Sequence, residues 1–202
     1  TALRRQRQMC IRDREKIGKE STPNTLAILP LKNTVLFPGV IIPITIGRDK
    51  SIKLINDSEN SNNKIGVLSQ KDPHIEIPTT KDLNHIGTVA QILKTLKMPD
   101  GNITAIIQGR KRFKVENIVK EEPYIVASVQ EINDKKYQKN KASDALISSV
   151  RDLALKIIDE SPNIPSEANI ALKNIKSSSF LINFVSSNMN IDLETKQKVK
   201  RN

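Results

Sequence analysis

Glycine and proline are distributed unevenly along this chain of 202 residues, and their distribution constrains the fold more than any other feature. Six of the seven glycines and eight of the ten prolines lie between residues 23 and 123, and no glycine occurs from Lys111 to the end. Both residue types interrupt helices and mark turns between strands. We therefore expect a first half made of short strands and a second half made of helices.

Seven runs in the first half have the length and apolar content of β-strands: residues 26–31, 40–46, 65–69, 87–98, 103–108, 113–119 and 124–132. The tripeptide Pro99-Asp100-Gly101 predicts a tight hairpin, in which Gly101 takes the positive φ of a sharp reversal. Ile52 and Ile55 lie one helical turn apart and predict a short helix over residues 49–56. Many short strands with one inserted helix are typical of a small, strongly curved sheet or barrel.

The charged segment KKYQKNK follows the strands, and helical periodicity begins after it. Ser143 is expected to cap a helix that ends near Glu160. One face of this helix should pack against the rest of the molecule; it carries Leu146, Val150, Leu153 and Ile157, with Ile147, Ala154 and Ile158 beside them. Further helices are predicted to begin at Pro165 or Ser166, at Ser177–Ser179 and after Asp192; the last has no capping signal before Asn202, which suggests that it is cut off there.

The first 14 residues, TALRRQRQMCIRDR, contain five arginines and one aspartate and supply +4 of the formal net charge of +11. They resemble a translated adapter scar; a disordered basic tail and a nucleic-acid-binding arm remain alternatives. We expect residues 1–24 to be a disordered tail. Cys10 is the one cysteine, and no apolar run reaches the ~18 residues that span a bilayer. These features indicate a soluble cytoplasmic protein.

Four segments carry a recognisable pattern: LPLKNTVLFPGVIIPITIGRDKSI (29–52), GTVAQILKTLKMPDG (87–101), IIQGRKRFKV (106–115), and NIPSEA with FVSSNMNIDLETKQ (163–168 and 184–197). In order and spacing they resemble the N-terminal domain of ATP-dependent Lon proteases. The resemblance implies an α+β chain with a PUA-like β-barrel over 25–132, a charged linker over 133–142 and a helical subdomain over 143–202. In the complete enzyme, an ATPase module and a Ser-Lys peptidase module follow this region.

The residues themselves offer no catalytic site. No G-x-x-x-x-G-K-[ST] phosphate loop occurs, and the one S-x-x-K, Ser61 to Lys64, lies in a polar loop that could not lower the pKa of the lysine. His74 and His85 lack the further cysteine or histidine ligands of a zinc site. We therefore expect no enzyme activity, metal or cofactor in this chain. ATP and Mg²⁺ are expected only in the ATPase module.

The resemblance implies a binding role in protein quality control. This region of Lon helps to capture unfolded or damaged polypeptides before they are threaded into the ATP-driven pore. An exposed apolar surface or a free strand edge could supply such contacts. The candidates are the Pro/Gly-flanked loop of Phe37, Pro38 and Val40, and the strand end of Leu96 and Met98.

The partners implied by the resemblance are the substrate polypeptides and the ATPase module of the same polypeptide. The complete enzyme is expected to be a homo-hexamer, whereas this fragment is expected to be a monomer or a weak dimer. No membrane partner is expected.

A basic cluster, formed by Arg110, Lys111, Arg112 and Lys114, leaves other functions open. It could be a solvated strand face, a contact for acidic substrate segments or the ATPase module, or part of an RNA-binding PUA-like module. Residues 21–132 contain 14 Lys or Arg against 11 Asp or Glu, which makes nucleic acid an unlikely partner. A stand-alone LON-domain adaptor is a further alternative.

Overall fold

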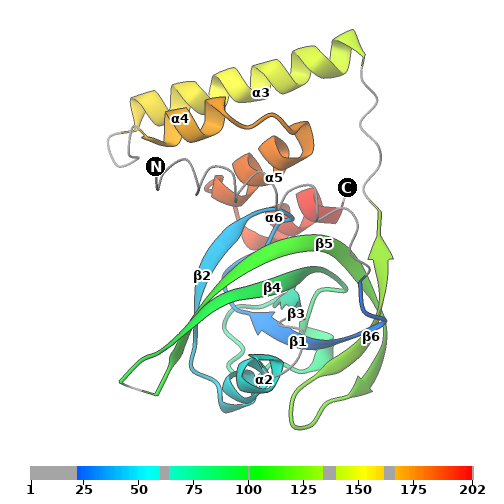
Figure 1. Ribbon diagram of the computed structural model, residues 1–202. Helices are drawn as coiled ribbons and strands as arrows, with labels where there is room; N and C mark the ends of the chain where they lie inside the picture. Colours follow the sequence, from blue (N-terminus) through cyan, green and yellow to red (C-terminus); the bar gives the residue numbers. More distant parts are fainter. Residues whose placement is uncertain (1–21, 60–63, 100, 134–139, 162–166, 202) are drawn as a thin grey trace.

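The computed structural model describes residues 22–59, 64–99, 101–133, 140–161 and 167–201. Within these ranges the chain is a mixed α+β structure with a six-stranded sheet and five α-helices. The strands form the lower part of the molecule in Figure 1 and four of the helices lie above them. None of the described helices is both long enough and apolar enough to span a membrane.

The strand region matches most of the predicted elements. Its elements are β1 (Thr25–Leu31), β2 (Ile41–Ile46), α2 (Asp49–Glu59), β3 (Lys64–Ser69), a 3₁₀ turn (Thr80–Asp82), β4 (Ile86–Lys97), β5 (Ile103–Lys120) and β6 (Val126–Ile132). The division of residues 103–119 into two strands is wrong, because β5 is continuous through Gly109, which pairs with Ala90. Gly109 serves a close approach here: a Cβ on it would lie 2.2 Å from the carbonyl oxygen of Phe37.

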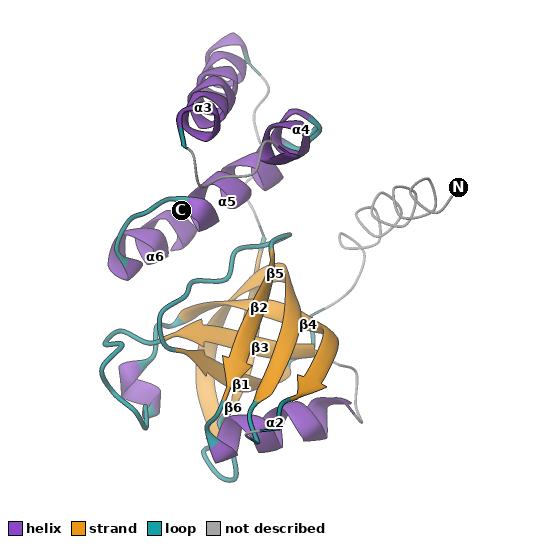
Figure 2. Ribbon diagram, turned by 90° about the vertical axis from the view of Figure 1, so that its left-hand side faces the viewer, coloured by secondary structure: helices purple, strands orange, loops and turns teal. Residues whose placement is uncertain are grey.

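The strands follow the order β2-β5-β4-β3-β1-β6, and β5 also pairs with β6. Five strands, β5, β4, β3, β1 and β6, therefore form a closed circuit of pairings, and β2 is attached to β5 alone. The β1–β3 pair is parallel and the other pairs are antiparallel. Register shifts in the β4–β5 and β5–β6 pairs accompany the strong curvature of the sheet that Figure 2 shows.

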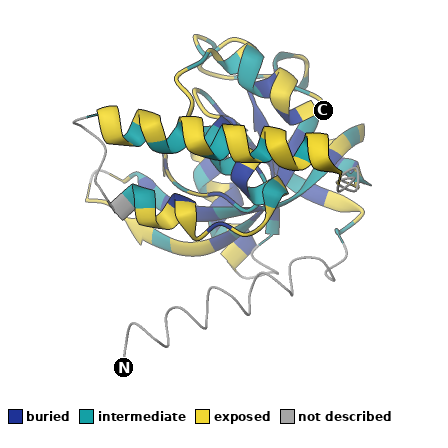
Figure 3. Cartoon of the chain, turned by 90° about the horizontal axis from the view of Figure 1, so that it is seen from above, coloured by how far each residue is buried: buried dark blue, intermediate teal, exposed yellow. Residues whose placement is uncertain are grey.

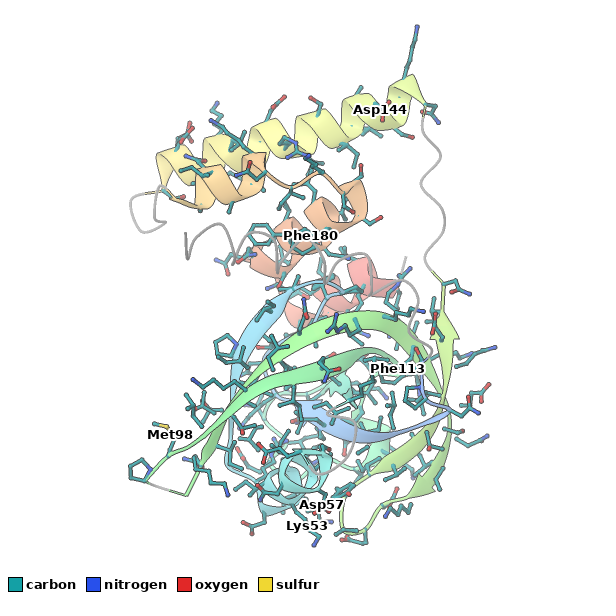
Figure 4. All side chains as sticks on the ribbon, viewed as in Figure 1. Lys53, Asp57, Met98, Phe113, Asp144 and Phe180 are labelled. Carbon is teal, nitrogen blue, oxygen red and sulfur yellow. The ribbon has the colours of Figure 1, made fainter. Side chains whose placement is uncertain are left out.

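The core of the strand region is aliphatic, in keeping with a chain that has no Trp. Leu54 and Ile55 of α2 are fully buried and pack with Ile65 and Ile107 from the sheet. A second cluster surrounds Phe113, which is also fully buried and lies inside the strand region in Figure 4. The helix α2 therefore covers one end of the sheet.

The helices that follow are α3 (Lys141–Glu160), α4 (Glu167–Lys173), α5 (Ser178–Asn188) and α6 (Leu193–Arg201). Ser177 caps α5, and Asp192 caps α6 by accepting a 2.8 Å hydrogen bond from the backbone N–H of Thr195, as predicted. This hydrogen bond and one from the Thr195 hydroxyl hold the pKa of Asp192 below its ordinary value. The cap of α3 is Asn140 rather than Ser143, whose N–H donates to the Asn140 side chain. The predicted start of α4 at Pro165 or Ser166 lies outside the described residues.

The predicted packing face of α3 is only partly correct. Leu146, Leu153 and Ile157 are exposed by 68%, 62% and 60%, and Figure 3 shows α3 crossing the top of the molecule with exposed residues along it. The residues that pack against α4 and α5 are Ile147, Ala154, Leu155 and Ile158. The helix carries two adjacent apolar rows, and periodicity alone does not show which row meets the neighbouring helices.

Helices α5 and α6 lie against the strand region, whereas α3 and α4 lie farther from it (Figures 1 and 2). Leu193 of α6 packs against the buried cluster of Val35, Phe37 and Val40. Gln197 of α6 is 3% exposed, accepts a 3.1 Å hydrogen bond from the Ser69 hydroxyl and donates a 2.8 Å bond to the Ile86 carbonyl. Apolar and polar contacts thus join the two parts.

Candidate functional site

The hairpin between β4 and β5 extends away from the rest of the strand region (Figure 1). At its tip the backbone N–H of Met98 donates to the Asn102 carbonyl over 2.8 Å, and Gly101 has a φ of 84°, as predicted. Leu96 and Met98 are exposed by 46% and 45%, and Figure 4 shows Met98 at the tip. These two predicted binding residues therefore offer apolar surface to solvent.

Strand geometry explains the exposure of Leu96. It pairs with Thr104, on the sheet face opposite the buried Ile103 and Ala105. Leu93, earlier on β4, is 47% exposed and lies at a register shift between Ile92 and Lys94. Sequence reasoning missed Leu93 because an apolar residue within an apolar strand is expected to be buried. No residue type in ILKTL (residues 92–96) signals the register shift that exposes it.

The loop of Phe37, Pro38 and Val40 does not offer the surface expected from its Pro/Gly-rich sequence. Phe37 is 1% exposed and Val40 is 7% exposed, so both are core residues. The Pro38 carbonyl accepts a 3.2 Å hydrogen bond from the Asn183 side chain of α5. Gly39 has a φ of 80°, and a Cβ on it would lie 2.6 Å from the Phe180 ring. The loop is tightly packed because helices from the second half of the chain cover it.

The basic cluster does not form one exposed patch. Lys111 pairs with Glu131 over 2.6 Å, and Arg112 donates a 2.6 Å hydrogen bond to the carbonyl of Lys200 in α6. Burial raises the pKa of Glu131, but hydrogen bonds from Lys111 and Thr22 outweigh it and lower the pKa below its ordinary value. Arg110 is half-buried, and Lys114 is exposed. Lys111 and Arg112 therefore contribute to internal contacts.

The described residues contain no group of three or more His, Cys, Asp or Glu side chains arranged to hold a metal ion. His74 and His85 are exposed, and the backbone N–H of His74 donates to Asp72 in a local turn. Ser61 lies outside the described residues, so the Ser61–Lys64 pair has no described geometry.

Comparison with protein families decides the classification. The family model described as the ATP-dependent protease La (LON) substrate-binding domain matches residues 25–199. The chain belongs to the LON substrate-binding domain family. The alternatives drawn from the basic cluster do not change this assignment, which rests on nearly the whole described chain.

Curated relatives of this LON domain are Lon proteases. The chain is 56% identical to the Lon protease of Flavobacterium johnsoniae over 186 residues, which cover 92% of this chain and 23% of that protein. It is 45% identical to the Lon protease of Cytophaga hutchinsonii over 185 residues, again 23% of that protein and 91% of this chain. The chain thus spans less than a quarter of the length of these relatives.

Solved structures agree on the fold of the LON domain. The N-terminal domain of a Mycobacterium avium complex Lon protease aligns with a TM-score of 0.69 at 16% identity, covering 87% of this chain and 89% of that one. A Lon N-terminal domain protein from Xanthomonas campestris aligns with a TM-score of 0.53 at 17% identity, covering 83% of this chain and 99% of that one. Both are chains of similar extent, and they share the fold of this chain.

Proposed function

We propose that this chain captures unfolded or damaged polypeptides for an ATP-dependent Lon protease in protein quality control, and that the β4–β5 hairpin makes the first contact. The observation that carries the proposal is the exposure of Leu93, Leu96 and Met98 on a projecting hairpin. Exposed apolar side chains can bind the apolar segments that folded proteins bury, and the unbranched Met98 adapts to different sequences.

The remaining functional inferences depend on the longer relatives. We infer that ATP hydrolysis and peptide cleavage belong to ATPase and Ser-Lys peptidase modules of the complete protein, which acts as a cytoplasmic homo-hexamer. The LON domain supplies no catalytic residue or cofactor in this scheme. The closed circuit of strands supports a PUA-like β-barrel as the scaffold that holds the hairpin.

The test is the double substitution Leu96→Ser and Met98→Ser. Binding of a fluorescently labelled, reduced and carboxymethylated protein, which cannot refold, is measured by anisotropy. We expect the affinity to fall at least tenfold, because burying one large apolar side chain contributes ~1.5 to 3 kcal/mol and about 1.4 kcal/mol corresponds to a factor of ten. Thermal stability should stay unchanged, since both side chains are already exposed.

A matched control removes two exposed apolar residues from another surface. Leu146→Ser with Leu153→Ser on α3 should leave the affinity unchanged. Equal losses in both double variants would show non-specific adhesion and contradict a hairpin site. Unchanged binding by the hairpin variant would contradict the proposal directly.

A further inference from the structure

A cavity of about 540 Å³ is lined by residues of α2, β1 and the segments around Ile77 and Tyr124. Figure 1 shows α2 at the end of the strand region that lies away from α3–α6. The apolar lining residues of the cavity include Ile28, Leu54 and Ile125. Its volume lies within the ~300 to 1,000 Å³ of cavities that bind ligands, and an apolar lining is typical of them.

Ile77 lines the cavity and its side chain is 79% exposed. The segment before Ile77 is anchored by the buried Gln70, whose side-chain N–H donates to the Ile75 carbonyl over 2.9 Å. Arg48 donates to the Gln70 side chain over 2.8 Å. The backbone near Ile77 is therefore held in place, while the Ile77 side chain itself stays largely exposed.

Acidic residues outnumber basic residues among those that line the cavity, although the chain as a whole carries a net charge of +11 and Lys120 lies 5.5 Å from the ring of Tyr124. The carboxylates among the lining residues are Asp49, Glu76, Glu121 and Glu122, and the cations are Arg48 and Lys50. Glu76 pairs with Lys32, and Glu122 pairs with Lys50 over 2.5 Å, in exposed contacts that contribute little net energy. Acidic groups around an apolar cavity favour an apolar ligand that carries positive charge beside it.

The hairpin has the opposite local charge. Lys94 and Lys97 are exposed on β4, beside Leu96 and Met98. We therefore expect basic segments to favour the cavity over the hairpin.

We propose that the cavity is a second polypeptide-binding site, which takes an apolar side chain flanked by Lys or Arg in an extended segment. This inference rests on the proposed function, since it specifies part of the substrate class of the same domain. The apolar side chain enters against Ile28 and Leu54, and the flanking cations approach Glu121 and its neighbouring carboxylates. The side chain of Ile77 covers the bound residue.

Tyr124 provides a direct readout of the cavity. The chain contains no Trp and two Tyr, so the substitution Tyr137→Phe leaves Tyr124 as the single fluorophore. The probe is the peptide Gly-Ser-Lys-Leu-Leu-Lys-Ser-Gly, titrated against this variant, with Gly-Ser-Glu-Leu-Leu-Glu-Ser-Gly as its matched acidic control. We expect a saturable change in Tyr124 fluorescence with the basic peptide and at least a fivefold weaker response to the acidic peptide.

Two further substitutions, made in this background, test the apolar and the electrostatic contributions. Ile77→Ser should weaken binding of the basic peptide about fivefold without unfolding the domain, because Ile77 is largely exposed. Glu121→Lys should reduce the preference for the basic over the acidic peptide, and the reduction should shrink as salt is raised. Leu96→Ser with Met98→Ser should leave basic-peptide binding unchanged.

The outcomes separate this inference from the proposed function. If Tyr124 does not respond to either peptide, or if Ile77→Ser has no effect, the cavity site is wrong, whereas the hairpin proposal stands as long as its own double variant loses binding of the unfolded protein. If the hairpin variant alone abolishes basic-peptide binding, the peptide binds at the hairpin and the cavity site is also wrong.

Discussion

Thr88 is a fully buried polar residue in β4, and its hydroxyl donates a 2.7 Å hydrogen bond to the backbone carbonyl of Leu36. The bond ties the strand to the segment that precedes β2. We expect Thr88→Val, which keeps the shape of the side chain, to lower the free energy of unfolding by about 1 to 2 kcal/mol. Urea denaturation measures the change. Thr45→Val on the exposed face of β2 is the control and should change the free energy of unfolding by less than about 0.5 kcal/mol. Equal changes in the two variants would contradict a special role for the Thr88 hydrogen bond.

Lys200 is a buried cation next to Arg112. Burial, and to a smaller extent the charge of Arg112, lower the pKa of Lys200 from its ordinary 10.5 to about 7. Between these two values the unfolded chain binds a proton that the folded chain has released, so stability rises with pH across this window; below about pH 7 the full cost of the buried charge is present.

Replacing Lys200 by Met tests this linkage, because Met keeps an unbranched apolar chain and cannot be charged. We expect Lys200→Met to unfold at a higher temperature than the wild type at pH 7, and the difference to decrease steadily towards pH 10. Melting curves at pH 6 to 10 measure it. Parallel pH profiles for the two proteins would contradict a lowered pKa at this position.

At the scale of an element, α3 shows how burial separates two neighbouring residues of the same type. Ile158 packs against the cluster formed with α4 and α5, whereas Ile157 is 60% exposed. We expect Ile158→Ala to lower the free energy of unfolding by about 1 to 3 kcal/mol and Ile157→Ala by less than about 0.5 kcal/mol. Chemical denaturation of the two variants measures the contrast. The reverse order would mean that the row of α3 containing Ile157 is the one that packs against α4 and α5.

Elements with local signals could be predicted from the sequence. Gly101 marks the hairpin because a positive φ is a property of one residue, and Asp192 marks the start of α6 because a cap acts within one turn. The burial of Phe37 could not be predicted, since the cluster that contains it packs against Leu193, far along the chain. The cavity was missed for the same reason: Ile77 and Tyr124 come from segments that only the folded chain brings together.

At the scale of the whole molecule, the packing of α5 and α6 against the strands leaves the hairpin and the cavity uncovered. In Figure 1 the hairpin and α2, whose residues line the cavity, lie on the part of the molecule away from α3 and α4. The loop around Phe37, which the sequence suggested as a binding surface, is instead one of the contacts that join the helices to the strand region. The helical part can therefore stay docked while both proposed surfaces bind a polypeptide.

Leu193 is the apolar residue of α6 that packs against the cluster of Val35, Phe37 and Val40. We expect Leu193→Asp to lower the free energy of unfolding of the docked helices α5 and α6 by about 1 to 3 kcal/mol. A carboxylate placed against apolar side chains loses hydration without gaining a partner. Hydrogen exchange followed by mass spectrometry should show faster exchange in α5 and α6 and unchanged protection in β3 and β4, since the closed circuit of strand pairings does not depend on the helices.

Val199→Asp, on the same helix at a side chain that is 39% exposed, is the matched control and should leave exchange in α6 close to wild type. If Leu193→Asp instead accelerates exchange throughout the strands, the helices are part of the same cooperative unit as the sheet, and the strand region cannot act as an independent scaffold for the hairpin and the cavity.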